Sequence, residues 1–202
     1  MGKTHWLLYH PDEALAYYRQ SLSVCQQLSD LEGMLELYNA MANIHFKKGM
    51  MDMCHSCLRC YLTLAGILSK DTARLNAFIS IGRTLLLRQR YTEAKKIFTK
   101  ALNLTTETNY RRERGLIYGY MAECYLGIGE KSKALVNFCK QIPFFDDIDD
   151  IEGKCETLRH LIEEKQLIKD VNWTMRLCSN RIQLSQMGSI DLQVILLVKS
   201  II

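Results

Sequence analysis

Proline is scarce in this chain, and its scarcity leaves room for long helices. Only Pro11 and Pro143 occur among the 202 residues, so few positions lack the amide donor that a helix interior needs. The alternation of apolar and polar residues that is typical of half-buried strands is almost absent before the C-terminus. We therefore expect an all-α protein with no sheet of consequence before residue 187.

A strong net charge and a long apolar segment are also lacking. The 26 basic residues are scattered among 22 acidic ones, for a formal charge of +4, which is not the basic surface of a nucleic-acid-binding protein. The longest apolar stretch, 190–202, is shorter than the roughly 20 residues of a membrane-spanning helix. The first ten residues contain only a four-residue apolar run, too short for a secretory signal. These features predict a cytoplasmic protein whose eight cysteines are reduced thiols.

No arrangement of catalytic residues can be recognised. The five histidines are dispersed and belong to neither a Ser/His/Asp set nor a Glu-x-x-His motif. They are His5, His10, His45, His55 and His160. We therefore predict that the chain is not an enzyme and needs no cofactor.

An internal repeat of 40 residues is the main signal that the sequence does contain. It appears as columns of large residues, each followed four residues later by a small one, and as two further columns in the next segment. The first pair of columns is Tyr38, Phe78 and Tyr118 with Ala42, Gly82 and Ala122; the second pair is Ala14, Cys54, Ala94 and Ala134 with Tyr18, Leu58, Phe98 and Phe138. Four aligned columns are not expected by chance.

This spacing predicts pairs of antiparallel helices. Residues four apart lie on one face of a helix, where a small side chain lets a neighbouring helix approach and an aromatic ring fills the remaining space. Short links between the two helices of a pair are Lys47-Lys48-Gly49, Arg88-Gln89-Arg90 and Gly127-Ile128-Gly129. The expected helices are 11–28, 31–48, 51–69, 71–88, 91–107, 110–127, 131–142, 150–165 and 168–186.

Several residues are expected to mark helix starts. Ser29 with Glu32 reads as a capping box, Asp71 is placed to cap the helix that carries Phe78, and Pro11 suits a first helical turn.

The repeat resembles the tetratricopeptide family. The resemblance is carried by Phe78, Ile81-Gly82, Leu85, Tyr91, Ala94, Phe98 and Ala101, and in the next unit by Tyr118, Met121-Ala122, Tyr125, Gly129, Ala134 and Phe138. Because the usual period of that family is about 34 residues, the longer unit is similar to the subclass found in LGN/Pins adaptors, rapsyn and kinesin light chains. The resemblance implies a right-handed superhelical solenoid of antiparallel helical hairpins that acts as a scaffold for other proteins.

The period divides the chain into successive units. The expected boundaries are a partial first repeat at 1–30, repeats at 31–70, 71–109 and 110–149, a divergent repeat or cap at 150–187, and an apolar segment at 188–202. In this scheme the helix 11–28 lacks its partner, and neither end supplies the polar cap that repeat arrays need. We therefore expect self-association through the ends, with Tyr18 and its apolar neighbours exposed.

Three clusters of chemically active residues need an interpretation. The thiols of Cys54, Cys57 and Cys60 have a spacing that suits metal ligands, but Cys54 stands in a column of alanines, so we predict core packing and no metal. The acidic run 146–150 lacks the glycine and the closing glutamate of a calcium loop and is expected to cap a helix. The basic clusters around Arg112 and Lys96 have no interleaved aromatic residues and are expected to be solvated.

The resemblance places partner binding on a concave wall made by the first helix of each unit. On these helices the residues that follow the small column, and those one turn and two turns earlier, point away from the core. The predicted groove residues are Arg83, Asn43, Asn39, Glu123, Asn76, Glu36 and Phe46, with Ile79 and Gly119 at equivalent positions. We expect them to bind a peptide or helical segment of another protein.

Two other functions are compatible with the same repeats. The chain could be a regulatory repeat region of a larger enzyme or transcription regulator, which a catalytic or DNA-binding motif outside these residues would favour. It could also be a truncated product without independent function, which poor expression and rapid degradation would favour.

Overall fold

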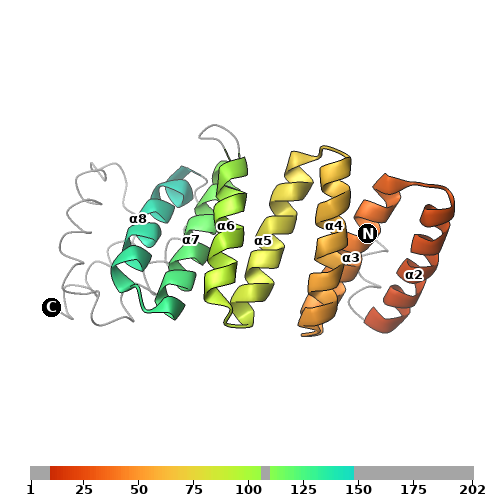
Figure 1. Cartoon of the computed structure of the whole chain (residues 1–202), viewed down its shortest axis with the longest axis horizontal. Coiled ribbons are helices and arrows are strands. Elements are labelled where there is room, and N and C mark those ends of the chain that lie inside the picture. Colours follow the sequence, from red (N-terminus) through yellow and green to blue (C-terminus); the bar gives the residue numbers. More distant parts are fainter. Residues whose placement is uncertain (1–9, 106–109, 148–202) are drawn as a thin grey trace. The chain divides into compact units, whose positions relative to one another are not determined.

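The computed structural model describes residues 10–105 and 110–147. Within these residues all regular secondary structure is helical, and consecutive helices pack in antiparallel pairs (Figure 1). The helices are α2 Pro11–Gln27, α3 Leu31–Lys47, α4 Met51–Ile67, α5 Asp71–Leu87, α6 Tyr91–Leu104, α7 Arg111–Ile128 and α8 Lys131–Asp147. The all-α fold is confirmed, whereas the predicted helices 150–165 and 168–186 and the segment 188–202 lie outside the described residues.

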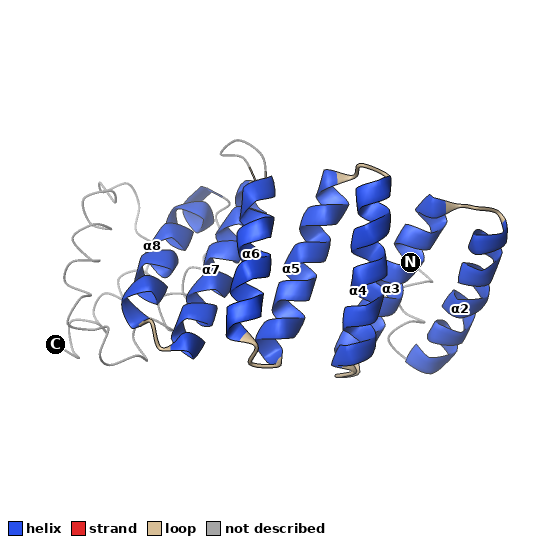
Figure 2. Ribbon diagram, in the orientation of Figure 1, coloured by secondary structure: helices blue, strands red, loops and turns tan. Residues whose placement is uncertain are grey.

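The 40-residue period arises from the lengths of the helices and turns. Helices α2, α3, α4 and α5 each have 17 residues, and three residues separate each of them from the next helix (Figure 2). One residue of each of these turns, and of the turn between α7 and α8, adopts a left-handed conformation. The five residues are Ser29, Gly49, Ser69, Gln89 and Gly129. A helix and its turn therefore span 20 residues, and a hairpin spans 40.

All five turns have the same hydrogen bonds. In the first of them the Ser29 amide donates to the Gln26 carbonyl at 3.3 Å, and the Asp30 amide donates to the Cys25 carbonyl at 2.9 Å. These two bonds satisfy carbonyls at the end of α2 that have no partner within the helix, in the arrangement called a Schellman motif. The same pair of bonds recurs at Gly49, Ser69, Gln89 and Gly129. One backbone geometry therefore ends five of the described helices.

Most residues of the repeat columns form the core, as predicted, but the large residues of the first pair, Tyr38, Phe78 and Tyr118, are only half-buried. Tyr18 of the second pair, which was expected to be exposed, is half-buried as well. Ala42 and Ala122 are 1% and 0% exposed, and a Cβ added to Gly82 would lie 2.5 Å from the ring of Phe98 on the next helix. In the second pair of columns all four small residues and three of the four large ones are buried. These are Ala14, Cys54, Ala94, Ala134, Leu58, Phe98 and Phe138. Small residues let the helices approach, and the large ones fill the space between them.

The chain divides into two compact units, residues 1–106 and 107–202. Among the described residues the first unit contains α2 to α6 and the second contains α7 and α8. Helix α6 differs from the earlier helices because it has only 14 residues and ends at Leu104, before an extended Thr105. The prediction that this helix extends to residue 107 is therefore wrong.

The predicted caps of α3 and α5 are also wrong. Asp30, not Ser29, caps α3, and its carboxylate accepts a hydrogen bond from the Gly33 amide at 2.9 Å. Ser29 cannot do so because it occupies the left-handed position of the turn, whereas a capping residue needs extended backbone. Asp71 is the first residue within α5 and binds Arg74 at 2.9 Å instead of capping the helix.

Each proline has a different role in its helix. Pro11 is the first residue of α2, as predicted, where a missing amide costs nothing. Pro143 was expected to follow the last helix of its hairpin, but α8 continues through it to Asp147. A proline within a helix costs about 3 kcal/mol, and the packing of Phe144 offsets part of this cost. The Phe144 ring lies 5.9 Å from that of Tyr118 on α7.

Ion pairs repeat with the same period in the first unit. Lys48, after α3, binds Asp12 at the start of α2, and 40 residues later Arg88, after α5, binds Asp52 at the start of α4 at 2.7 Å. Because these carboxylates are mostly exposed, each pair contributes only about 0–1 kcal/mol. Thr92 follows at the next equivalent position, so the pattern of acidic residues ends there.

Candidate partner-binding surface

The predicted groove residues of α3 lie along one side of that helix. Glu36, Asn39, Asn43 and Phe46 are spaced by three, four and three residues, which places them on one face. Glu36 and Asn43 are exposed, whereas Asn39 and Phe46 are half-buried. The row is therefore polar, with an aromatic ring at its C-terminal end.

The equivalent row of α5 is formed by Asn76, Ile79 and Arg83. Asn76 and Arg83 are exposed and Ile79 is half-buried, in agreement with the prediction that they point away from the core. Helix α4 packs against both α3 and α5, so the two rows belong to the same unit.

A contact between Arg83 and Phe46 joins the two rows. The guanidinium carbon of Arg83 lies 5.1 Å from the centre of the Phe46 ring, within the range of a cation–π interaction. The contact restricts the position of the arginine side chain. The structure therefore brings together two predicted residues that are 37 positions apart in the sequence.

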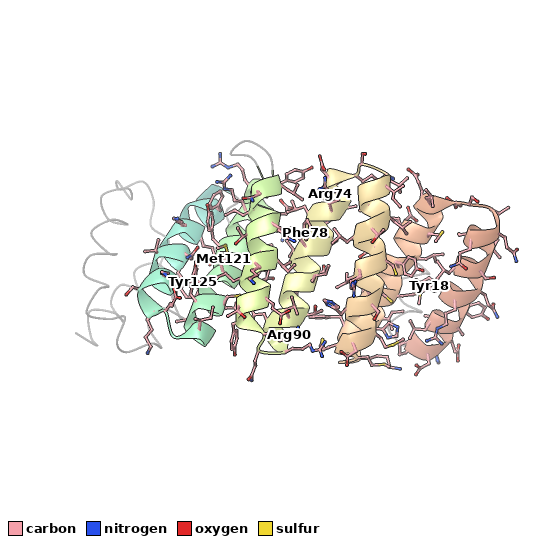
Figure 3. The ribbon with its side chains drawn as sticks, in the orientation of Figure 1. Tyr18, Arg74, Phe78, Arg90, Met121 and Tyr125 are labelled. Atoms are coloured by element: carbon pink, nitrogen blue, oxygen red, sulfur yellow. The ribbon has the colours of Figure 1, made fainter. Side chains whose placement is uncertain are left out.

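Two other arginines of this unit are bound to nearby carboxylates. Arg74, near the start of α5, donates to Asp71 at 2.9 Å. Arg90, after the end of the same helix, donates to both carboxylate oxygens of Glu93 at 2.7 Å, and Figure 3 shows the two arginines at opposite ends of α5. The guanidinium group of Arg90 therefore already makes with Glu93 the two parallel hydrogen bonds that it would need to bind a carboxylate of a ligand.

Two predicted groove positions fall in the second unit. Glu123 is half-buried on α7 and interacts within the structure. Gly119 is not part of an open surface, because a Cβ at this position would lie 2.5 Å from the side-chain amide of Gln141 on α8. The expectation that Gly119 points away from the core is therefore wrong. Small size at this position allows α7 and α8 to approach closely.

The cysteine cluster of α4 is divided between core and surface. Cys54 and Cys57 are 2% and 7% exposed, as packing in the core requires, and burial raises the pKa of the Cys54 thiol to about 11. Cys60 is exposed and lies beside Tyr38, whose pKa is raised by burial and by this thiol. In the described part of the chain no three histidine, cysteine or acidic side chains are placed to hold a metal ion.

Sequence reasoning missed the environment of His45. This histidine of α3 is 1% exposed, and neither ring nitrogen has a hydrogen-bond partner. Burial lowers its pKa, and the positive charges of Arg19 and Lys48 lower it further. The repeat could have predicted this burial, because the residue at the equivalent position 40 residues later is the apolar Leu85, which is also buried.

Other predicted features lie outside the described surface or add little to it. The acidic run begins in the last turn of α8, and the helix that it was expected to cap lies outside the described residues. Arg111 and Arg112 are exposed at the start of α7.

None of the helices in residues 10–105 and 110–147 has the length and apolar character needed to cross a membrane.

Comparisons with known proteins identify the repeats. Residues 1–30 and 75–108 match two models of the tetratricopeptide repeat. No curated protein has a significant sequence match to the chain.

Solved structures with the same fold include repeat proteins from two other organisms. One is BtubC (BKLC) from P. vanneervenii, which is 15% identical, with a TM-score of 0.63 over 94% of this chain and 82% of that one. A P. anserina protein assigned as a kinesin light chain, with nearly identical TPR-like repeats, is 12% identical, with a TM-score of 0.57 over 85% of this chain and 93% of that one. Together with the columns and the antiparallel hairpins, these matches support the tetratricopeptide-repeat superfamily for the matched segments 1–30 and 75–108, and the solved structures have the same TPR-like fold.

Proposed function

We propose that this chain is an adaptor that binds a peptide or helical segment of another protein along the exposed rows of α3 and α5. Repeats of this superfamily serve as scaffolds for protein interaction, and the two rows form a polar surface on one unit. Cys25, Cys54, Cys57 and Cys60 form no disulfide, which supports a reducing compartment such as the cytoplasm.

The observation that carries this proposal is the arrangement of Arg83, Phe46 and Asn43. Arg83 is exposed but held over the Phe46 ring, so less side-chain entropy is lost when it binds a ligand. Its guanidinium group can hold a carboxylate with two parallel hydrogen bonds. Asn43 is exposed on the row that Phe46 ends, and its amide can bond the backbone of an extended or helical ligand. We therefore propose Arg83 as the main anchor.

The experiment compares variants of the full chain by affinity capture from lysate, followed by titration with the captured partner. Arg83→Ala should weaken binding by roughly 1.5–3 kcal/mol, the value of a hydrogen bond to a charged group, or about 10- to 150-fold in Kd. Asn43→Ala tests a second position of these rows. Lys96→Ala is the control, because Lys96 is exposed on α6 outside both rows, and it should change Kd less than twofold.

The opposite pattern would contradict the proposal. If Lys96→Ala abolishes binding while Arg83→Ala and Asn43→Ala leave it intact, the partner uses another face of the repeats. The absence of any partner retained by the unmodified chain would argue against the adaptor function itself.

A further inference from the structure

The repeat explains the cysteines of α4 to different degrees. Cys54 stands in the column of alanines and is buried as they are. Cys60 has no such explanation, because the equivalent residues of α2, α6 and α8 are long and polar. These residues are Gln20, Lys100 and Lys140. Cysteine is among the most buried residue types, yet Cys60 is exposed, so packing does not account for a thiol at this position.

Cys57 lies one helical turn before Cys60 on the same side of α4. Residues three apart on a helix are neighbours, and both cysteines belong to the continuous helix Met51–Ile67. Tyr38 of α3 lies beside both thiols. Its hydroxyl donates a hydrogen bond to the Cys60 sulfur, and its pKa is raised by burial and by the two thiols. The two sulfur atoms are therefore close to each other where α3 and α4 pack together.

The two thiols differ in their access to solvent. Cys57 is 7% exposed, and its pKa is raised by burial and by the neighbouring Cys60, so little of it is present as the reactive thiolate. Cys60 is open to solvent. An accessible thiol with a second thiol beside it is the arrangement of a redox-sensitive pair, in which the outer cysteine meets the oxidant and the inner one reacts with the product.

We propose that Cys60 and Cys57 are a peroxide-sensitive pair that is converted reversibly to a disulfide within α4. The Cys60 thiolate first attacks hydrogen peroxide, so that an S–O bond forms and the O–O bond breaks. The products are a sulfenic acid and a hydroxide, which takes up the proton that Cys60 had released. The Cys57 sulfur then attacks the Cys60 sulfur, an S–S bond forms, and the S–O bond breaks; the hydroxide leaves as water with the proton of Cys57. The two thiols together lose two electrons, and one peroxide becomes two waters.

Oxidation should also disturb the packing of α4. A disulfide needs Cβ atoms about 3.5–4.5 Å apart, closer than the roughly 5–6 Å between residues three apart in a regular helix. The turn from Cys57 to Cys60 must therefore tighten, and it includes Leu58, which is 2% exposed in the core. Because α4 packs against both α3 and α5, this distortion should lower the stability of the first unit.

Peroxide treatment of the reduced full chain, followed by alkylation, tryptic digestion and mass spectrometry, tests the pair. Trypsin cleaves after Lys48, Arg59 and Lys70, so Cys57 and Cys60 fall on the separate peptides 49–59 and 60–70. We expect a disulfide to join these two peptides in the unmodified chain and dithiothreitol to release them. C54S should still form the joined peptides, which assigns the bond to Cys57 because Cys54 belongs to the same peptide.

Three further variants separate the two roles. C57S should lose the joined peptides and leave a sulfenic acid at Cys60 that dimedone traps, whereas C60S should lose both products. C25S is the matched control, because Cys25 is a partly exposed thiol with no second cysteine within one turn of α2. This variant should form the joined peptides as the unmodified chain does.

Urea unfolding measures the effect of oxidation on the fold. The midpoint should be lower for the oxidised chain than for the reduced chain, should recover with dithiothreitol, and should not fall in this reversible way in C57S/C60S. Peptides that are never joined, a joined pair that persists in C57S, Cys60 disulfides that form only between chains, or an unchanged midpoint would overturn the proposal. These measurements do not depend on partner binding at the Arg83 surface.

Discussion

At the scale of single residues, His45 shows how the residue at one position of a repeat can lower the stability of the fold. A buried polar group without a hydrogen bond costs about 1–3 kcal/mol in proteins, and both nitrogens of this ring lack partners. The equivalent Leu85 fills the same position in the next repeat without that cost. The core thus accepts a leucine here, and the histidine makes the fold less stable and dependent on pH.

The stability of the chain should fall as the pH drops below about 6.5, the ordinary pKa of histidine. Burial and the charges of Arg19 and Lys48 lower the pKa of His45 in the folded state. Well above pH 6.5 the ring is neutral in both states, so the full stability is present. As the pH falls toward the lowered pKa, the unfolded chain binds a proton that the folded chain does not, and the free energy of unfolding decreases by at most about 1.4 kcal/mol per pH unit.

Urea unfolding at pH 7.5 and pH 5.0 measures this effect. His45→Leu should raise the free energy of unfolding at both pH values and reduce its change between them. Burial also lowers the pKa of His55, so part of the pH dependence should persist. An unchanged pH dependence in His45→Leu would show that this ring is not the source.

At the scale of helices and turns, the sequence predicted the hairpins better than their ends. The columns set the period and the faces, because small and large residues four apart lie on one face of a helix. The ends of the helices were harder to predict. The same three residues terminate one helix and precede the first residue of the next. Ser29 has the chemistry of a cap but takes the left-handed position, and Asp30 caps α3. Composition alone does not distinguish the two roles.

Replacement of a turn residue by glycine should stabilise the fold. Gln89 has a φ of 58°, which costs a side-chain-bearing residue about 1–2 kcal/mol. Glycine avoids this cost but loses more backbone entropy on folding, so Gln89→Gly should raise the free energy of unfolding by about 0.5–1 kcal/mol. Lys96→Gly, within α6, should lower it by about 1 kcal/mol. Chemical unfolding of both variants measures the difference, and a destabilised Gln89→Gly would contradict the shared turn geometry.

At the scale of the whole molecule, periodicity predicted the fold, whereas the surface could be predicted only in part. Arg83 and Phe46 were both expected on one wall, but their contact depends on how α3, α4 and α5 pack together. Gly119 is buried because α8 approaches it, although its counterparts Asn39 and Ile79 are half-buried. The same position of a repeat thus has different neighbours in different hairpins, and the repeat columns do not show which neighbours it has.

The cysteines allow the packing of the whole chain to be tested by thiol labelling. Among the cysteines that the structure describes, Cys54, Cys57 and Cys124 are buried and Cys60 is exposed, so iodoacetamide should modify Cys60 before these three in the native protein. The pKa of Cys54, raised to about 11, leaves about one thiolate per thousand at pH 8, and the thiolate is the reactive form. Mass spectrometry of digested protein at successive times measures each site. The three buried thiols should react rapidly only in denaturant, with rates unaffected by a metal chelator. If the chelator exposes Cys54, Cys57 and Cys60 together, the cluster holds a metal ion and the core interpretation is wrong.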